Sequence, residues 1–213
     1  MTEPLACVVV AYKLPAPVVN AFFKNNEVLA AMASIYLVTD NKTPFHVEHV
    51  PCPEMNPFAI CRAANLGIRR AINDGADVVL KTDIDCIWTI DAIGDLMKIK
   101  RGAGICWRYW HIPDAMHLHY AKMDSRCVGS AALAAFDWLR LCGYDERMNG
   151  YGHDDGNLLR RARSAGIKLP VKAKPRLYHV RHSKHNRSTI NPFRRQENRA
   201  IGMDVWNNPA WGL

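Results

Sequence analysis

Runs of apolar and polar residues predict that strands and helices succeed one another along this 213-residue chain. LACVVVA at 5–11 is a continuous, β-branched run that ends in a Pro-containing break, which predicts a buried strand followed by a loop. Residues 18–33 carry apolar residues at helical spacing. IYLVTD at 35–40 predicts a second strand, and the alternating segment 45–50 predicts an edge strand.

The alternation continues through the middle of the chain. Residues 56–75 open with Asn-Pro and close with Asp-Gly, which are typical helix boundaries, and they lead into DVVLKTD, a predicted strand at 77–83. The remaining expectations are a helix at about 90–100, strands at 102–107 and 129–136, an irregular stretch at 109–124, a helix at 155–165 and an aperiodic basic tail from 170 onward. This order predicts an α/β fold with helices flanking a central sheet, and the length suits a single domain.

The composition, 49% hydrophobic and 23% charged, is ordinary for a globular protein and argues against extended disorder. No apolar run approaches the length of a membrane span, and the start of the chain does not read as a signal peptide. Five of the seven cysteines fall in hydrophobic or helical stretches without CxxC spacing, which predicts reduced, buried thiols and a cytoplasmic protein: Cys7, Cys61, Cys86, Cys106 and Cys142.

Charge is distributed unevenly. Residues 160–213 carry 13 Lys and Arg against two acids, a net charge of +11, whereas residues 1–159 carry a net charge of −3. The C-terminal quarter therefore suits an anionic partner such as a diphosphate, an acidic glycan, nucleic acid or a membrane surface. No GxGxxG follows the first predicted strand, GAG at 102–104 is too short a match, and a Walker P-loop is absent, which argues against a dinucleotide-binding or P-loop protein.

Two carboxylates, Asp83 and Asp85, end the predicted strand at 77–83, where ligands of an α/β sheet bind. Loop aspartates often cap turns or helices, which is the simpler interpretation. The functional interpretation is a divalent cation site, since hard carboxylate oxygens can hold a metal against an anionic substrate. An Asp-X-Asp motif by itself leaves both open.

A second acidic pair, Asp154 and Asp155, follows the Gly-Tyr-Gly at 150–152 and opens a predicted amphipathic helix. Carboxylates at a helix start commonly cap free amides and stabilise the helix dipole. Two adjacent acids beside an aromatic residue also suit one cap and one exposed general base.

Three histidines stand three residues apart in the basic tail, at 179, 182 and 185. They could form a solvated face, especially His185, or two of them could ligate one cation. Among the aromatic residues, Trp107, Tyr109 and Trp110 could either stack on a substrate or close the core. Trp206 and Trp211 are expected to pin the tail to the body of the protein. His111, His117 and His119 receive no role.

The three motifs occur together and in order, and in this the chain resembles the GT-A glycosyltransferases, most closely the β-1,4-galactosyltransferase group. The resemblance rests on PFAICRAANLGIRRAINDGADVVLKTDID, GSAALAAFDWLRLCGYDERMNGYGHDDGNLLRR and HVRHSKHNRSTINPFRR, and covers roughly residues 5–195. It implies a GT-A, Rossmann-like single domain over 1–213 with a mixed central sheet. Residues 1–100 would form the half that binds the nucleotide sugar, and 101–213 the acceptor-binding half with the metal-binding tail.

The resemblance also implies roles for individual residues. Asp85, His179 and His182 would ligate Mn²⁺ or Mg²⁺, and Asp155 would be the catalytic base. Donor binding would involve Tyr12, Lys13, Phe58, Arg62 and Asp83, and acceptor binding Tyr151, Gly152 and Asp154. His179 stands where animal members usually have Met, which bears on metal preference because imidazole replaces a thioether.

These roles predict an enzyme that transfers a hexose from a UDP-sugar to a saccharide or glycoconjugate hydroxyl in one inverting displacement. The first alternative is a phage-type DNA glycosyltransferase that acts on a hydroxymethylated base, which the basic tail permits. The second is a non-enzymatic, basic nucleic-acid- or metal-binding module, which leaves Asp83 and Asp85 unexplained. The expected setting is the cytoplasm of a bacterium or of a phage-infected cell.

Overall fold

The structure is a computed structural model. It describes residues 4–11, 16–39, 47–52, 59–113, 118–148, 152–174, 176–180, 192–201 and 206–212, with the backbone alone described at 120, 124–128 and 192–196.

The described strands form one nine-stranded sheet, in the order β3-β2-β1-β4-β7-β6-β9-β5 with β8 beside β6. Their bounds are β1 (Leu5–Val10), β2 (Ser34–Thr39), β3 (Glu48–Pro51), β4 (Val78–Asp83), β5 (Cys86–Trp88), β6 (Ile105–Ile112), β7 (Lys122–Ala134), β8 (Val171–Lys172) and β9 (Leu177–Val180). Strands β1 to β4 are mutually parallel, and β7 runs antiparallel to both β4 and β6. The predicted mixed central sheet is therefore confirmed.

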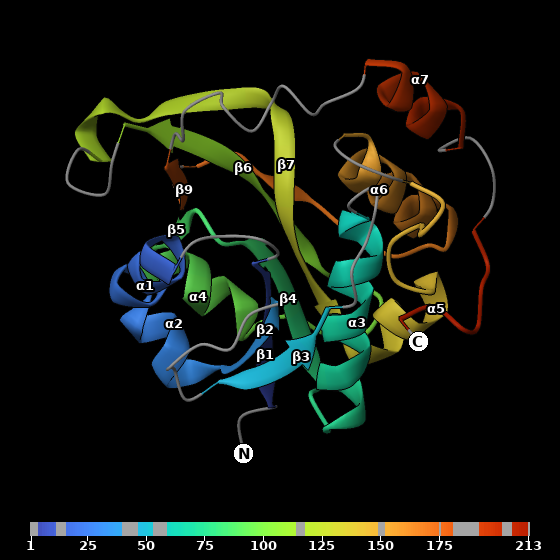
Figure 1. The fold of residues 1–213 in the computed structure, drawn as a ribbon, viewed down its shortest axis with the longest axis horizontal. Coiled ribbons are helices and arrows are strands. Elements are labelled where there is room, and N and C mark those ends of the chain that lie inside the picture. The colour runs from blue at the N-terminus through green and yellow to red at the C-terminus, as the bar shows by residue number, and fades with distance from the viewer. Residues whose placement is uncertain are drawn as a thin grey trace.

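Helices cover both faces of this sheet (Figure 1). Their bounds are α1 (Ala16–Asn25), α2 (Glu27–Met32), α3 (Ile60–Asn73), α4 (Ile90–Leu96), α5 (Ala135–Leu141), α6 (Asp154–Ser164) and α7 (Pro192–Ile201), with a 3₁₀ turn at Leu118–Tyr120. Side chains of β1 alternate between two cores: Val8 packs with α3, α5 and α6, whereas Val9 packs with α1, α2 and α4. A Cβ at Gly67 of α3 would lie 2.4 Å from Val8, so this glycine lets the helix approach the sheet.

The helix predicted over 18–33 is broken at Asn26, between α1 and α2. The Asn26 side chain is buried and binds backbone: Nδ2 donates to the carbonyl groups of Phe22 and Cys86, at 2.9 Å each, and Oδ1 accepts from the amide of Trp88 at 2.8 Å. A long-range contact thus interrupts the helix and fixes β5, because a side-chain amide there satisfies strand backbone groups.

Two regions predicted to be irregular contain regular structure. The stretch 109–124 is shared between the end of β6 and the start of β7, and the tail from 170 contains β8, β9 and α7. The predicted strand at 129–136 also gives way to α5 at Ala135. Strands β8 and β9 form by pairing with β5 and β6, which lie far away along the chain, and local periodicity does not reveal such partners.

The five cysteines predicted to be buried thiols are free and buried, as is Cys52. Within the described ranges, no helix is long and apolar enough to cross a membrane. Trp211 is buried, and Trp206 Nε1 donates to the carbonyl group of Cys142 at 2.9 Å, so the predicted anchoring of the tail is confirmed.

Candidate active site

The carboxyl ends of the parallel strands meet at one edge of the sheet, where β4 ends in Asp83. Val10, the last residue of β1, pairs with Asp83 in the register of the sheet. A turn at Ile84 and Asp85 then leads into β5. Behind this turn, Trp88 Nε1 donates to Thr82 Oγ1 at 3.1 Å, and Asn26 binds both ends of β5. The Asp-X-Asp segment is therefore held from two sides.

Asp85 and His179 come together at this edge. Cys86 pairs with His179 where β5 runs antiparallel to β9, and the amide of Val180 donates to the Asp85 carbonyl oxygen at 2.9 Å. This register places His179 Nε2 3.1 Å from Asp85 Oδ2. His182 lies outside the described residues, so the structure places two of the three predicted metal ligands and brings them into contact.

This pair fits a divalent transition metal. A carboxylate oxygen suits Mg²⁺ and Mn²⁺, and an imidazole nitrogen suits transition metals, so the mixed pair favours Mn²⁺ over Mg²⁺. In the part of the chain that the structure describes, no group of three His, Cys, Asp or Glu side chains could hold a metal ion. A complete ligand set therefore needs groups beyond Asp85 and His179, such as His182 or donor phosphate oxygens.

Asp83 is held at both carboxylate oxygens. Lys81 Nζ donates to Oδ1 at 2.7 Å, and the Tyr109 hydroxyl donates to Oδ2 in a short hydrogen bond. Gly129 lies at a bulge in the pairing of β6 with β7, and a Cβ there would lie 1.6 Å from the Tyr109 hydroxyl oxygen. This glycine therefore makes room for the tyrosine that orients Asp83.

Lys81 is the buried cation of the site, with 2% of its surface exposed. Its Nζ also donates to the carbonyl oxygen of Gly129 at 3.2 Å and lies 5.7 Å from the centre of the Tyr144 ring. Burial alone would lower the pKa of Lys81, but the charges of Asp83, Asp155 and Asp154 more than offset it, and the pKa is raised. The ammonium group therefore stays charged and links the two acidic pairs electrostatically.

Asp154 and Asp155 open α6, and both side chains are half-buried. Burial and the charge of Asp154 raise the pKa of Asp155 well above its usual value, although Lys81 and the Tyr144 hydroxyl, 3.5 Å from Asp155 Oδ1, oppose this shift. Burial also raises the pKa of Asp154, which Lys81 opposes. A carboxylate in such a setting accepts a proton more readily than an exposed one.

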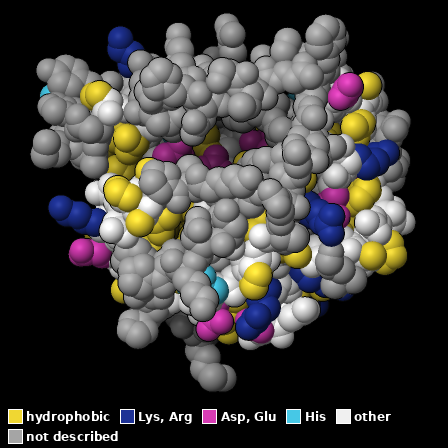
Figure 2. All heavy atoms as spheres, in the orientation of Figure 1, with side chains coloured by type: hydrophobic (Ala, Val, Ile, Leu, Met, Phe, Trp, Pro, Cys, Tyr) yellow, Lys and Arg dark blue, Asp and Glu magenta, His cyan; other side chains and the backbone are white. Residues whose placement is uncertain are grey.

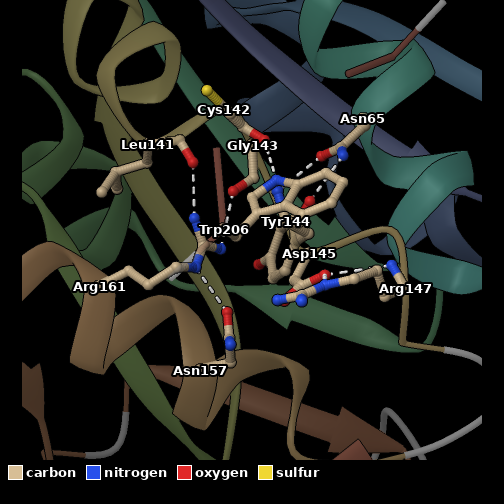
Figure 3. Close-up of polar contacts among 10 residues, drawn as sticks. All are labelled: Asn65, Leu141, Cys142, Gly143, Tyr144, Asp145, Arg147, Asn157, Arg161 and Trp206. Atoms are coloured by element: carbon tan, nitrogen blue, oxygen red, sulfur yellow. Dashed lines mark hydrogen bonds and ion pairs between the residues drawn. The ribbon is translucent and has the colours of Figure 1, made fainter. Parts of the chain in front are cut away.

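Hydrogen bonds behind Tyr144 hold the loop that faces Asp155 (Figure 3). Asn65 of α3 is fully buried: Oδ1 accepts from the Tyr144 amide at 2.8 Å, and Nδ2 donates to the Tyr144 carbonyl oxygen at 2.9 Å. Arg161 of α6 donates to the carbonyl oxygens of Leu141 and Gly143, at 2.6 and 2.8 Å. The helix that carries Asp155 is thus joined to the loop that carries Tyr144.

The other predicted site residues are less informative. Arg62 is exposed on α3, and Gly152 has a φ of 102° just before α6, a left-handed conformation that favours glycine. Tyr12, Lys13, Phe58 and Tyr151 lie outside the described residues.

In the orientation of Figure 1, acidic side chains gather in a hollow of the face that Figure 2 shows.

Sequence reasoning missed Lys81 and His111 and left Tyr109 ambiguous. Tyr109 reaches the site, whereas Trp107 is buried in the core against Trp88, with 4.9 Å between ring centres. His111 Nδ1 lies 3.2 Å from His179 Nδ1. The available signal was the spacing of Tyr109 and His111, two apart on one strand, which can place both on the same face.

Neither a protein-family model nor a curated protein matches the sequence. Among solved structures, the catalytic domain of Drosophila β1,4-galactosyltransferase 7, in complex with xylobiose, matches with a TM-score of 0.60 and 16% identity, over 96% of this chain and 82% of that one. GalNAc-T7 with UDP, GalNAc and Mn²⁺ matches with a TM-score of 0.65 and 13% identity, over 96% of this chain and 49% of that one.

The mannosyltransferase PcManGT from Pyrobaculum calidifontis, in complex with GDP-Man and Mn²⁺, matches with a TM-score of 0.63 and 13% identity, over 98% of this chain and 67% of that one. These glycosyltransferases differ in donor but share an architecture with this chain. The chain therefore has a GT-A-like fold, as its sequence resemblance predicted.

Proposed function

We propose that this chain is a metal-dependent, inverting glycosyltransferase that moves a hexose from a UDP-sugar to a saccharide hydroxyl. The observation that carries the proposal is the 3.1 Å contact between Asp85 and His179, two residues from distant motifs that meet at the carboxyl edge of the sheet. That edge is where ligands bind in open α/β sheets. Structures of the same fold contain nucleotide sugars or UDP together with Mn²⁺.

Donor binding is assigned to the strand ends. Asp85 and His179, with His182, would hold Mn²⁺, which when bound would offset the negative charge of the diphosphate. Asp83, oriented by Lys81 and Tyr109, would accept hydrogen bonds from the ribose or the sugar. The remaining donor contacts are proposed for four residues: Tyr12, Lys13, Phe58 and Arg62.

Asp155 is proposed as the general base. The acceptor oxygen would attack the anomeric carbon, the bond from that carbon to the diphosphate oxygen would break, and the hydroxyl proton would pass to the Asp155 carboxylate. The raised pKa of Asp155 suits this step, because proton transfer is most efficient when the pKa of the base lies near the working pH. One displacement inverts the anomeric configuration and needs no covalent intermediate.

The acceptor is proposed to be a saccharide that contacts Tyr151, Gly152 and Asp154. Support comes from the β1,4-galactosyltransferase 7 structures, which contain xylobiose. In this proposal the donor half is 1–100, the acceptor half is 101–213, and the enzyme works in the cytoplasm. A hydroxymethylated DNA base is the competing acceptor, and it would be detected by mass analysis of nucleosides after incubation with modified DNA and UDP-sugars.

A donor screen tests the proposal. UDP-glucose, UDP-galactose, their N-acetyl forms, GDP-mannose and CMP-sugars would each be titrated with Mn²⁺, with Mg²⁺ and with a chelator, and binding followed by melting temperature and calorimetry. We expect a UDP-sugar to raise the melting temperature in Mn²⁺ and the chelator to abolish the shift. Failure of every nucleotide sugar to bind contradicts the proposal, and binding of GDP-mannose alone contradicts its UDP specificity.

A further inference from the structure

His111 stands beside the proposed metal ligand His179 and has no part in the function proposed above. It lies on β6, which runs parallel to β9, and the two histidines are register partners. Their Nδ1 atoms are 3.2 Å apart, and their rings meet edge to face at 85°, with 4.9 Å between the ring centres. The pairing of β6 with β9 therefore places the two histidine side chains next to each other.

The two ring nitrogens of His179 face different partners. Nε2 lies 3.1 Å from Asp85 Oδ2, and Nδ1 faces His111. A neutral imidazole that ligates a metal through Nε2 carries its proton on Nδ1. An N–H···N hydrogen bond needs one donor and one acceptor, so His111 Nδ1 must then accept this bond and carry its own proton on Nε2.

A third ring limits how His179 can turn. The Tyr109 ring packs against the His179 ring, with 4.7 Å between the ring centres and 34° between the planes, while its hydroxyl group is bound to Asp83. Tyr109 thus restricts the tilt of the imidazole, and His111 can fix its remaining rotation by the hydrogen bond at Nδ1. Histidine ligands of metals are commonly oriented by a partner on the second nitrogen.

We propose that His111 is a positioning residue: by accepting a hydrogen bond from His179 Nδ1, it fixes the tautomer and orientation in which His179 Nε2 faces the metal. This inference rests on the proposed function, because it needs the metal site at Asp85 and His179. It assigns His111 no contact with the metal or the substrate.

Mn²⁺ binding without donor tests the inference, measured by electron paramagnetic resonance of free Mn²⁺. His111→Phe keeps a ring of similar size but removes the acceptor, and we expect about 10–100-fold weaker binding. His111→Asn places an amide oxygen near the position of Nδ1 and should restore most of the affinity. His49→Phe, on β3 at the opposite edge of the sheet, is the matched control and should bind as the unaltered protein does.

Three results overturn the inference. One is unaltered Mn²⁺ affinity in His111→Phe, and another is an equal loss in His111→Phe and His111→Asn, which indicates ring packing. The third is one fewer coordinated imidazole nitrogen in His111→Asn by pulsed resonance, which makes His111 a direct ligand. In all three the proposed function stands, whereas failure of the unaltered protein to bind Mn²⁺ both without donor and in the presence of UDP overturns both proposals.

Discussion

The two acidic pairs of the site are held in different ways. Asp83 and Asp85 stand at the end of a strand, and hydrogen bonds from Lys81, Tyr109 and the β9 backbone fix them. Asp154 and Asp155 stand at the start of a helix, where the 3.5 Å contact from Tyr144 to Asp155 is long for an O–H···O hydrogen bond. The Asp83 carboxylate is thus bound tightly at both oxygens, whereas the contact from Tyr144 to Asp155 is looser.

The difference suits the two proposed tasks. A ligand for a metal or a sugar must keep its position, and strand register with charge-assisted hydrogen bonds provides this. A general base must gain and lose a proton, so strong hydrogen bonds to its charged form would make it a weaker base. The rigidity behind Asp155 comes instead from Asn65 and Arg161, which hold the neighbouring loop and helix without binding the carboxylate.

Removing the charge of Asp155 should produce the largest effect. Asp155→Asn keeps the shape of the side chain but cannot take the proton from the attacking hydroxyl group. We therefore expect turnover to fall about 10²–10⁴-fold while UDP-sugar binding survives. Radiometric turnover and calorimetric donor binding would measure this. Asp91→Asn, an exposed acid at the start of α4, is the control. Full turnover in Asp155→Asn would remove Asp155 from the mechanism, whereas an unaltered protein without turnover would favour the non-enzymatic module.

Asp85→Asn changes the pair at the end of the strand, Asp83 and Asp85, and should affect metal binding. Loss of a charged ligand should weaken Mn²⁺ binding by more than about 100-fold, beyond the loss expected for an outer-shell residue, and should raise KM for the donor. Asp155→Asn should leave Mn²⁺ affinity unchanged, so the two variants separate binding from proton transfer. If both lose Mn²⁺ affinity equally, the site does not divide between the two pairs as we describe.

The pair at the end of the strand, Asp83 and Asp85, was also easier to predict from the sequence than the pair at the start of α6. A continuous apolar run ending in Asp-X-Asp identifies both β4 and its carboxyl edge from local sequence. The contact with His179 is harder, because β9 has four residues and forms only by pairing with β5 and β6. Resemblance to a family suggested that contact, whereas periodicity did not.

Lys81 and His111 illustrate what local patterns cannot supply. A lysine inside an apolar strand does not reveal that Gly129 and Tyr144 will lie beside it. His111 acquires a partner only through the β6–β9 register. Likewise, the break at Asn26 depends on β5, sixty residues away along the chain. Each residue gains its role from a contact distant in sequence.

Asn65→Ala should loosen the support behind the base without touching either pair. It leaves the Tyr144 amide and carbonyl groups buried without their partner, so we expect a loss of about 2–4 kcal/mol in the free energy of unfolding. Denaturant unfolding would measure it. Asn73→Ala, at the exposed end of α3, should cost under about 0.5 kcal/mol. Equal stability of the two variants would show that Asn65 does not support the loop.

Lys81→Met tests whether the two acidic pairs are coupled, because the charge of Lys81 acts on both pairs. Its charge lowers the pKa of Asp155, so its removal should raise that pKa further. A base works only when deprotonated, and the acid limb of the kcat profile should therefore move to higher pH, with turnover approaching that of the unaltered protein above the new limb.

Lys98→Met, an exposed lysine beside Asp95, is the control and should leave the profile in place. If the acid limb of Lys81→Met stays where it was while donor KM rises, Lys81 serves Asp83 alone, and the two acidic pairs are electrostatically independent. A shift of the limb with donor KM unchanged would instead assign the lysine mainly to the base. A shift of both places a single buried charge in control of donor binding and proton transfer, as its position between Asp83 and Tyr144 indicates.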